Sequence, residues 1–208
     1  IYARVRKCQR VPPLRHAMVV ATRQSESILS SGRILDEDKI TRALNNAQNL
    51  GAEYAEIRLV SETTNTASLK DGKLERAIPG QEVGVTMRIL ADGAWGVHST
   101  SDIDSIIDQV EPTYRLAKAV AARRSPSQPA VGLAEVPVIE DELHWRSVKD
   151  VRDTSLDTRI ELMLAIDNEA KDHEKIVSTS TGWSDEHIHT ELMTTEGMNR
   201  VWSFPVSY

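Results

Sequence analysis

Two Asp-Gly pairs inside one long alternating stretch constrain the fold of this chain more than any other feature. Residues 83–89 alternate apolar side chains with small or polar ones, which is the two-residue period of a half-buried strand. Asp92-Gly93 follows this run, and Asp71-Gly72 separates two earlier runs of the same kind. Because a type I′ turn needs positive φ at both central residues, each Asp-Gly pair favours a tight hairpin.

Residues 54–101 therefore predict an antiparallel β-meander of about four strands with one apolar face. Residues 54–60 show the same alternation as residues 83–89. Pro79-Gly80 is typical of a turn and predicts a third reversal of the chain.

Three helical patterns accompany the meander. Residues 36–50 begin with an Asp cap, carry apolar residues at helical spacing and are followed by Gly51. Residues 101–122 form a second apolar stripe starting with a Ser101 cap, and Pro112 should kink or split it. Residues 155–171 form the third pattern. The predicted fold class is α+β, an antiparallel β-meander packed with helices and followed by a second α+β region.

Composition divides the chain into four segments. Residues 1–24 carry six basic residues and no acid, without a convincing apolar period, so we expect a disordered basic extension. Residues 25–124 are expected to form an N-terminal α+β domain, and the proline-containing segment 125–150 a linker. Residues 151–208 are expected to start a second, truncated α+β region. The extension has three open origins: a reading frame extended upstream of its true start, a flexible natural tail, or a targeting segment.

Charge and hydropathy exclude two classes of partner. The formal net charge is −6, which argues against general nucleic-acid binding. No apolar run approaches the roughly 20 residues that span a bilayer, so no membrane partner is expected. The single cysteine cannot form an internal disulfide, which favours a reducing compartment, and we expect a cytoplasmic location.

Three runs of sequence resemble the N-terminal domain of one known family. They are GAEYAEIRLV, SLKDGKLE and GVTMRILADGAWGVHSTSDID, within residues 36–122. Together they resemble the TldD/PmbA family of metallopeptidases, also named modulators of DNA gyrase. The resemblance implies hydrolysis of a peptide substrate, zinc or a similar divalent metal in the full-length protein, and pairing with a related TldD/PmbA subunit as a homo- or heterodimer.

The metal motif of that family, His-Glu-x-x-x-His, is absent from this sequence. The only His-Glu pair is His173-Glu174, and Ser178 stands at the position of the second histidine. No catalytic or metal-ligating residue of the family therefore maps onto this chain, and we expect no cofactor in it. We hypothesise that this chain is the N-terminal, non-catalytic portion of such a peptidase. The metal-activated water would then belong to a missing C-terminal half.

His187 and His189 are a separate candidate for metal chemistry. Two residues apart on a strand, both imidazoles point to one face and could share a metal. The sequence nominates no further ligands, and the alternative is a polar, solvent-facing strand.

Trp95, Gly96 and His98 are the candidates for a substrate- or partner-facing site. Gly93 and Gly96 leave bare backbone beside the Trp95 indole, which permits close approach of another chain. The alternative makes Trp95 a core anchor in an aromatic-poor sheet. A second functional hypothesis is a stand-alone, non-enzymatic module that binds a peptide or protein as an added strand at the edge of the meander.

Overall fold

The computed structural model describes residues 33–125, 127–145 and 150–207. The predicted basic extension, 1–24, lies outside the described residues. All helices and strands of the described residues belong to the unit that begins at Leu35.

Two tight hairpins build the first half of the sheet, as the Asp-Gly pairs predict. Strands β1 (Tyr54–Lys70), β2 (Lys73–Ala91) and β3 (Ala94–Thr100) pair antiparallel in succession. The first turn has φ of 49° at Asp71 and 77° at Gly72, and the second has 50° at Asp92 and 67° at Gly93. Positive φ at both central residues is the type I′ requirement, so both predicted turns are confirmed.

The third predicted reversal, at Pro79-Gly80, is wrong. Both residues lie inside β2, where Pro79 pairs with Asn65 and Gly80 with Thr64 of β1. Strand β3 pairs with β2 only from Val85 onward, so the earlier half of β2 has no strand on its outer side among the described residues. Proline is accepted at such an edge because its missing N–H leaves no hydrogen bond unmade. The meander consequently has two long strands and one shorter strand, β3, in place of about four.

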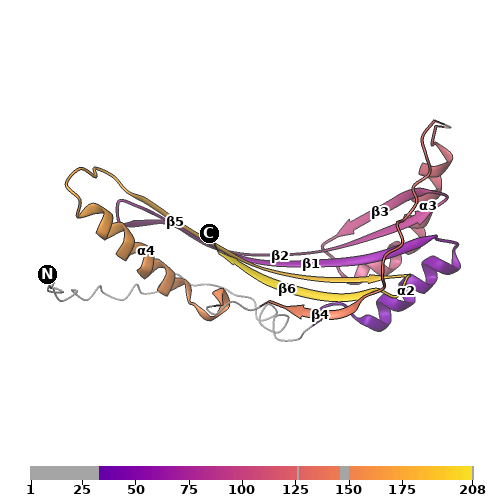
Figure 1. Ribbon diagram of the computed structural model, residues 1–208, viewed down its shortest axis with the longest axis horizontal. Helices are drawn as coiled ribbons and strands as arrows, with labels where there is room; N and C mark the ends of the chain where they lie inside the picture. Colours follow the sequence, from indigo (N-terminus) through magenta and orange to yellow (C-terminus); the bar gives the residue numbers. More distant parts are fainter. Residues whose placement is uncertain (1–32, 126, 146–149, 208) are drawn as a thin grey trace. The chain divides into compact units, whose positions relative to one another are not determined.

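The last strands of the chain join the same sheet. Strand β5 (Ser180–Thr194) pairs antiparallel with β1 and with β6 (Asn199–Ser207), and β4 (Glu140–His144) pairs parallel with β6. The order β3-β2-β1-β5-β6-β4 places β1 and β5 at the centre (Figure 1). The predicted division into a domain at 25–124, a linker at 125–150 and a second region from 151 is therefore corrected. The connecting segment joins two parts of one sheet, which its composition cannot reveal.

Local sequence signals set the helix boundaries. Helix α2 (Glu37–Asn49) begins where the Asp36 side chain accepts a hydrogen bond from the Lys39 N–H, and Gly51 follows it at φ 97°. The second predicted helix is split, as expected from Pro112, into the short helix η1 (Asp104–Gln109) and helix α3 (Val110–Ala122). Ser101 does not cap it; the Thr100 hydroxyl accepts the nearby Asp102 N–H instead.

The third helical pattern forms α4 (Leu156–Lys171), which Ser155 caps through the Thr158 N–H. A short helix, η2 (Val151–Asp153), precedes it and contacts β5 and β6. The α+β fold class is thus confirmed.

The helices pack on one face of the sheet, which we call the helix face. At one end α2 contacts β1 and β5, and α3 contacts β2 and β3; Ile57, Leu59 and Ile89 are almost fully buried there. At the other end Met163 of α4 packs on Ala67 and Leu69 of β1. Two apolar clusters, about 10 residues apart along β1, therefore fix the helices to the sheet. None of the helices in the described part of the chain is long and apolar enough to cross a membrane.

Gly93→Val should destabilise the fold. A Cβ at Gly93 would lie 2.6 Å from the Ala130 Cβ, and a β-branched residue is strained at φ 67°. We expect a loss of about 2–3 kcal/mol in the free energy of unfolding, measured by urea denaturation. Gly182→Val is the matched control because a Cβ there meets nothing within 4 Å. Equal effects of the two substitutions would contradict this account of the turn.

Candidate functional site

The three candidate residues of β3 do not share a face. Trp95 pairs with Leu90, whereas Gly96 pairs with Ile89 and His98 with Met87 on the helix face. Alternation along the strand therefore places Trp95 on the opposite face. His98 is half-buried, and its neighbour Val97 is 47% exposed.

Gly96 faces helix α3 of its own chain, which corrects its prediction as a partner-facing residue. A Cβ at this position would lie 2.1 Å from the Thr113 carbonyl oxygen and 2.9 Å from the Ala117 nitrogen. The bare backbone does permit close approach of another segment, as predicted. The segment that takes the space is α3, so Gly96 sets the packing of that helix on the sheet.

Trp95 belongs to a cluster of four side chains, Tyr54, Glu56, Arg88 and Trp95, which we call the Trp95 cluster. The Tyr54 and Trp95 rings meet edge to face with centroids 5.9 Å apart. The Arg88 guanidinium lies 5.0 Å from the indole centroid and donates from Nε to Glu56 Oε1 at 2.8 Å. The Tyr54 hydroxyl donates to Glu56 Oε2, also at 2.8 Å. Glu56 thus orients both neighbours of the indole.

The charges in this cluster are fixed by their hydrogen bonds. Burial opposes ionisation of Glu56, but the hydrogen bonds from Arg88 and Tyr54 and the Arg88 charge outweigh it and lower the pKa of Glu56. Burial and the hydrogen bond to Glu56 raise the pKa of the Tyr54 phenol. The hydrogen bond to Glu56 raises the pKa of Arg88 despite its partial burial. Trp95 therefore rests against a permanent cation.

An open cavity of about 670 Å³ lies beside Trp95, and we call it the Trp95 cavity. It forms between the β2–β3 turn, the last turn of α3 and the start of the connecting segment. Its lining residues are Gly93, Ala94, Trp95, Val120, Arg123, Arg124, Gln128, Pro129 and Val131. Val120 and Val131 are 45% and 39% exposed, so the wall is apolar and accessible.

The two arginines of this cavity have different roles. Arg124 Nη1 donates to the carbonyl oxygens of Asp92 and Gly93 at 3.0 and 2.9 Å, which ties α3 to the turn. Arg123 is exposed and has no ion pair within the described residues. Arg123 is therefore available to an anionic ligand.

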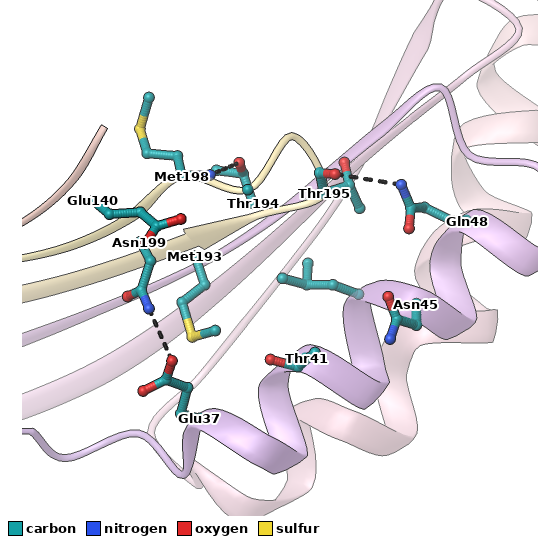
Figure 2. A pocket seen from close by; sticks show the side chains of 12 residues that line it. Glu37, Thr41, Asn45, Gln48, Glu140, Met193, Thr194, Thr195, Met198 and Asn199 are labelled. Carbon is teal, nitrogen blue, oxygen red and sulfur yellow. Dashed lines mark hydrogen bonds between the residues drawn. The ribbon is translucent and has the colours of Figure 1, made fainter. Parts of the chain in front are cut away.

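A second cavity, of about 290 Å³, lies between α2 and the β5–β6 turn (Figure 2). Glu37 accepts a hydrogen bond there from the Asn199 amide at 3.0 Å, and the Gln48 amide donates to the Thr195 carbonyl oxygen at 3.3 Å. Among the described residues, its only charged lining residues are Glu37 and Glu140. It would favour a cation, unlike the Trp95 cavity.

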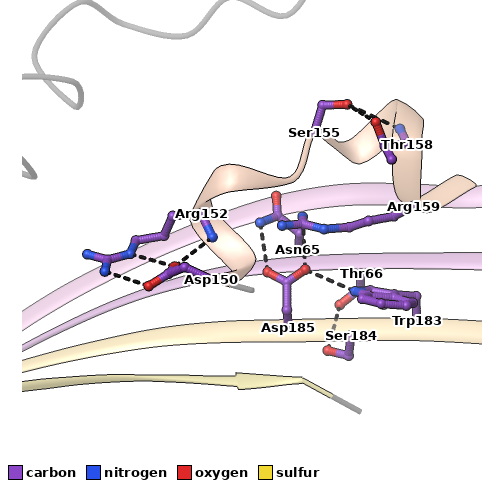
Figure 3. Close-up of polar contacts among 10 residues, drawn as sticks. All are labelled: Asn65, Thr66, Asp150, Arg152, Ser155, Thr158, Arg159, Trp183, Ser184 and Asp185. Carbon is purple, nitrogen blue, oxygen red and sulfur yellow. Dashed lines mark hydrogen bonds and ion pairs between the residues drawn. The ribbon is translucent and has the colours of Figure 1, made fainter. Parts of the chain in front are cut away.

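Polar side chains of β5 occupy the helix face between the two apolar clusters (Figure 3). Asp185 is buried and pairs with Arg159 of α4 at 2.8 Å. It also accepts hydrogen bonds from the Asn65 amide at 3.1 Å and the Trp183 indole N–H at 3.0 Å. Beside it, Arg152 forms a bidentate pair with Asp150, which lowers the pKa of Asp150 to about 2. The Arg159–Asp185 pair holds α4 against β5, whereas the Asp150–Arg152 pair is local to the segment that includes η2.

His187 and His189 do point to one face, but that face is buried, so the prediction of a solvent-facing strand is wrong. His189 Nε2 lies 2.9 Å from Glu191 Oε1, and Glu191 Oε2 accepts the Leu35 N–H at 3.0 Å. Burial, followed by the Arg152 charge, lowers the pKa of His187.

Over the described residues no group of three or more His, Cys, Asp or Glu side chains is arranged to hold a metal. The predicted pair His173-Glu174 is exposed after the end of α4.

Comparisons with known proteins show what this chain is similar to. Residues 55–123 match a family model described as PmbA/TldA metallopeptidase domain 1. The chain is 28% identical over 151 residues to a metalloprotease of Methanocaldococcus jannaschii, which covers 70% of this chain and 32% of the relative.

Solved structures share the fold. A structure described as a putative modulator of DNA gyrase from Bacteroides thetaiotaomicron aligns with a TM-score of 0.61 at 19% identity, over 84% of this chain and 40% of the other. TldE from Thermococcus kodakarensis aligns with a TM-score of 0.56 at 12% identity, over 81% and 37%. This chain spans about a third of the length of the curated relatives it matches. Over residues 55–123 this chain is therefore similar to the first domain of the TldD/PmbA family.

The Trp95 cluster should contribute acid-sensitive stability. The pKa of Glu56 in the folded state lies below its ordinary value of 4.5, so its contribution is complete above pH 4.5 and is lost as the pH falls through the folded pKa. Glu56→Gln should lower the free energy of unfolding at pH 7 by about 1–2 kcal/mol, a modest value because Arg88 is 43% exposed. It should also flatten the loss of stability toward pH 3. Urea denaturation between pH 7 and 3 measures both, with Glu62→Gln on the same strand as the control.

Trp95→Ala should cost about 1–3 kcal/mol, less than the 3–5 kcal/mol typical of a fully buried tryptophan. The cost is smaller because Trp95 is only partly buried. It is not zero, because the alanine variant lacks the ring contacts with Tyr54 and Arg88. Trp95→Phe keeps a ring in place and should cost less. Urea denaturation of both variants checks the order, and an unchanged stability of the alanine variant would exclude any structural role for the indole.

Proposed function

We propose that this chain is the N-terminal, non-catalytic portion of a TldD/PmbA-type metal-dependent peptidase. The observation that carries the proposal is the match of residues 55–123 to the first domain of that family, in a sequence without His-Glu-x-x-x-His. The proposed parent enzyme hydrolyses peptides with a metal-activated water, and zinc or a similar divalent ion is the proposed metal. The proposed location is the cytoplasm.

The proposed task of this portion is to shape access to the metal and to contact a related subunit. The helix face is occupied by α2, α3 and α4, so it supports the fold. The opposite face carries the Trp95 side chain. At this end of the sheet the accessible apolar Trp95 cavity includes Arg123, which has no ion pair within the described residues. This end of the sheet is the proposed surface for the peptide or for the partner subunit of a homo- or heterodimer.

A second candidate is a stand-alone module that binds peptides without cleaving them. The observation that favours it is the outer side of β2 before Val85, which has no neighbouring strand among the described residues. An extended peptide could pair there by strand addition. The two candidates differ in whether the protein needs a metal-bearing region to act.

The purified chain should show no metal-dependent peptidase activity, because its sequence lacks a recognised metal-binding motif such as His-Glu-x-x-x-His. The assay is cleavage of an unstructured peptide with added Zn²⁺ and with EDTA, next to the same protein extended by a region that carries His-Glu-x-x-x-His. Metal-dependent cleavage by the extended protein alone would support the peptidase proposal. Zinc-stimulated cleavage by the present chain, abolished by replacing His187 and His189, would overturn its non-catalytic role.

A further inference from the structure

The Trp95 cavity combines an apolar wall with a positive charge that is unpaired among the described residues. Val120 and Val131 supply apolar surface, Trp95 also lines the cavity, and Arg123 is exposed there. The chain as a whole carries a net charge of −6, so a basic, apolar recess is a local departure from its surface. Complementary charge favours an anion here.

No carboxylate lines this cavity among the described residues. The two nearest acids along the turn are engaged elsewhere: Asp92 pairs with Lys118, and Glu53 accepts the Gly93 N–H at 3.0 Å. Arg124 is also occupied by the turn carbonyls. Arg123 is consequently the cation that a ligand carboxylate would meet.

The cavity size suits a short piece of peptide. About 670 Å³ lies within the range of roughly 300–1,000 Å³ that small-ligand sites occupy. Arg123 and the apolar wall line one recess, so the ligand must present its charge and its apolar group close together. A C-terminal residue does this, since its carboxylate and its side chain share one Cα.

We propose that the Trp95 cavity binds the C-terminal carboxylate of a peptide whose last residue is apolar. Arg123 pairs with the carboxylate, and the apolar side chain lies against Val120 and Val131. The inference rests on the proposed peptide-facing role of this end of the sheet and requires no metal.

The test measures binding to the metal-free chain. The probe is a fluorescein-labelled hexapeptide ending in leucine, prepared as the free acid and as the C-terminal amide, and the readout is fluorescence anisotropy. The free acid should bind at least about tenfold more tightly than the amide, as a charge-assisted hydrogen bond predicts. Arg123→Gln should reduce binding of the acid to the level of the amide and leave amide binding unchanged.

Matched variants separate charge from contact area. Arg115→Gln removes an arginine from the same helix, where Arg115 is 75% exposed and pairs with Glu111 outside the cavity, and it should leave both affinities unchanged. Val120→Ser should weaken the acid and the amide alike, because it removes apolar wall without touching the charge. Circular dichroism of each variant verifies that the fold is retained.

Four results would overturn the proposal. They are equal affinities for acid and amide, an equal loss in Arg115→Gln, no binding of the acid up to millimolar concentration, and tight binding of an amide with an internal glutamate. The last result would assign the recess to acidic side chains. Since no metal or turnover enters the assay, failure here leaves the peptidase proposal to be judged by its own cleavage experiment.

Discussion

Strand β1 is hydrogen-bonded along almost its whole length on both sides, and the rest of the structure depends on that double pairing. Tyr54–Lys70 pairs with β2 on one side, and Glu56–Lys70 pairs with β5 on the other. The first pairing is local and is imposed by a two-residue turn. The second joins residues more than 100 positions apart, and it creates the surface on which α4 packs. Loss of the β1–β5 pairing would remove Trp183 of β5 from the cluster that Met163 of α4 forms with Ala67 and Leu69 of β1.

The buried polar band on the helix face separates the two apolar clusters. Buried charge is costly unless it is paired, and Asp185, His189 and Glu191 each have a partner. Removing one partner of such a group leaves an uncompensated charge, so these contacts specify which segment lies over which strand. The pairing of Arg159 with Asp185, for example, sets the position of α4 along β5. Apolar packing alone would tolerate a shift of the helix along the sheet.

The sequence predicted best those structures that depend on interactions between residues close together in the chain. The hairpins at Asp71-Gly72 and Asp92-Gly93 and the caps at Asp36 and Ser155 follow from residues within a few positions of each other. The return of β5 to β1 has no such signal, so segment 125–150 resembled a boundary between domains. Likewise, His187 and His189 looked solvent-facing because burial depends on distant segments. A visible clue was the unbroken alternation Asp185, His187, His189, Glu191, which puts four ionisable residues on one face of a central strand.

The connecting segment has one further consequence. Its Val131 N–H donates to the Gly93 carbonyl oxygen beside β3, and its Ile139 carbonyl oxygen accepts the Asn199 N–H at the start of β6 (Figure 1). The anchors are up to four strand spacings of about 4.8 Å apart across the sheet and about six residues apart along the strands, so the distance between them is roughly 25 Å. Eight extended residues reach at most about 26–29 Å. The segment between the anchors is therefore close to fully extended, and Pro137 within it favours extension over hinge-like bending. Shortening this segment would therefore break one of its two anchors.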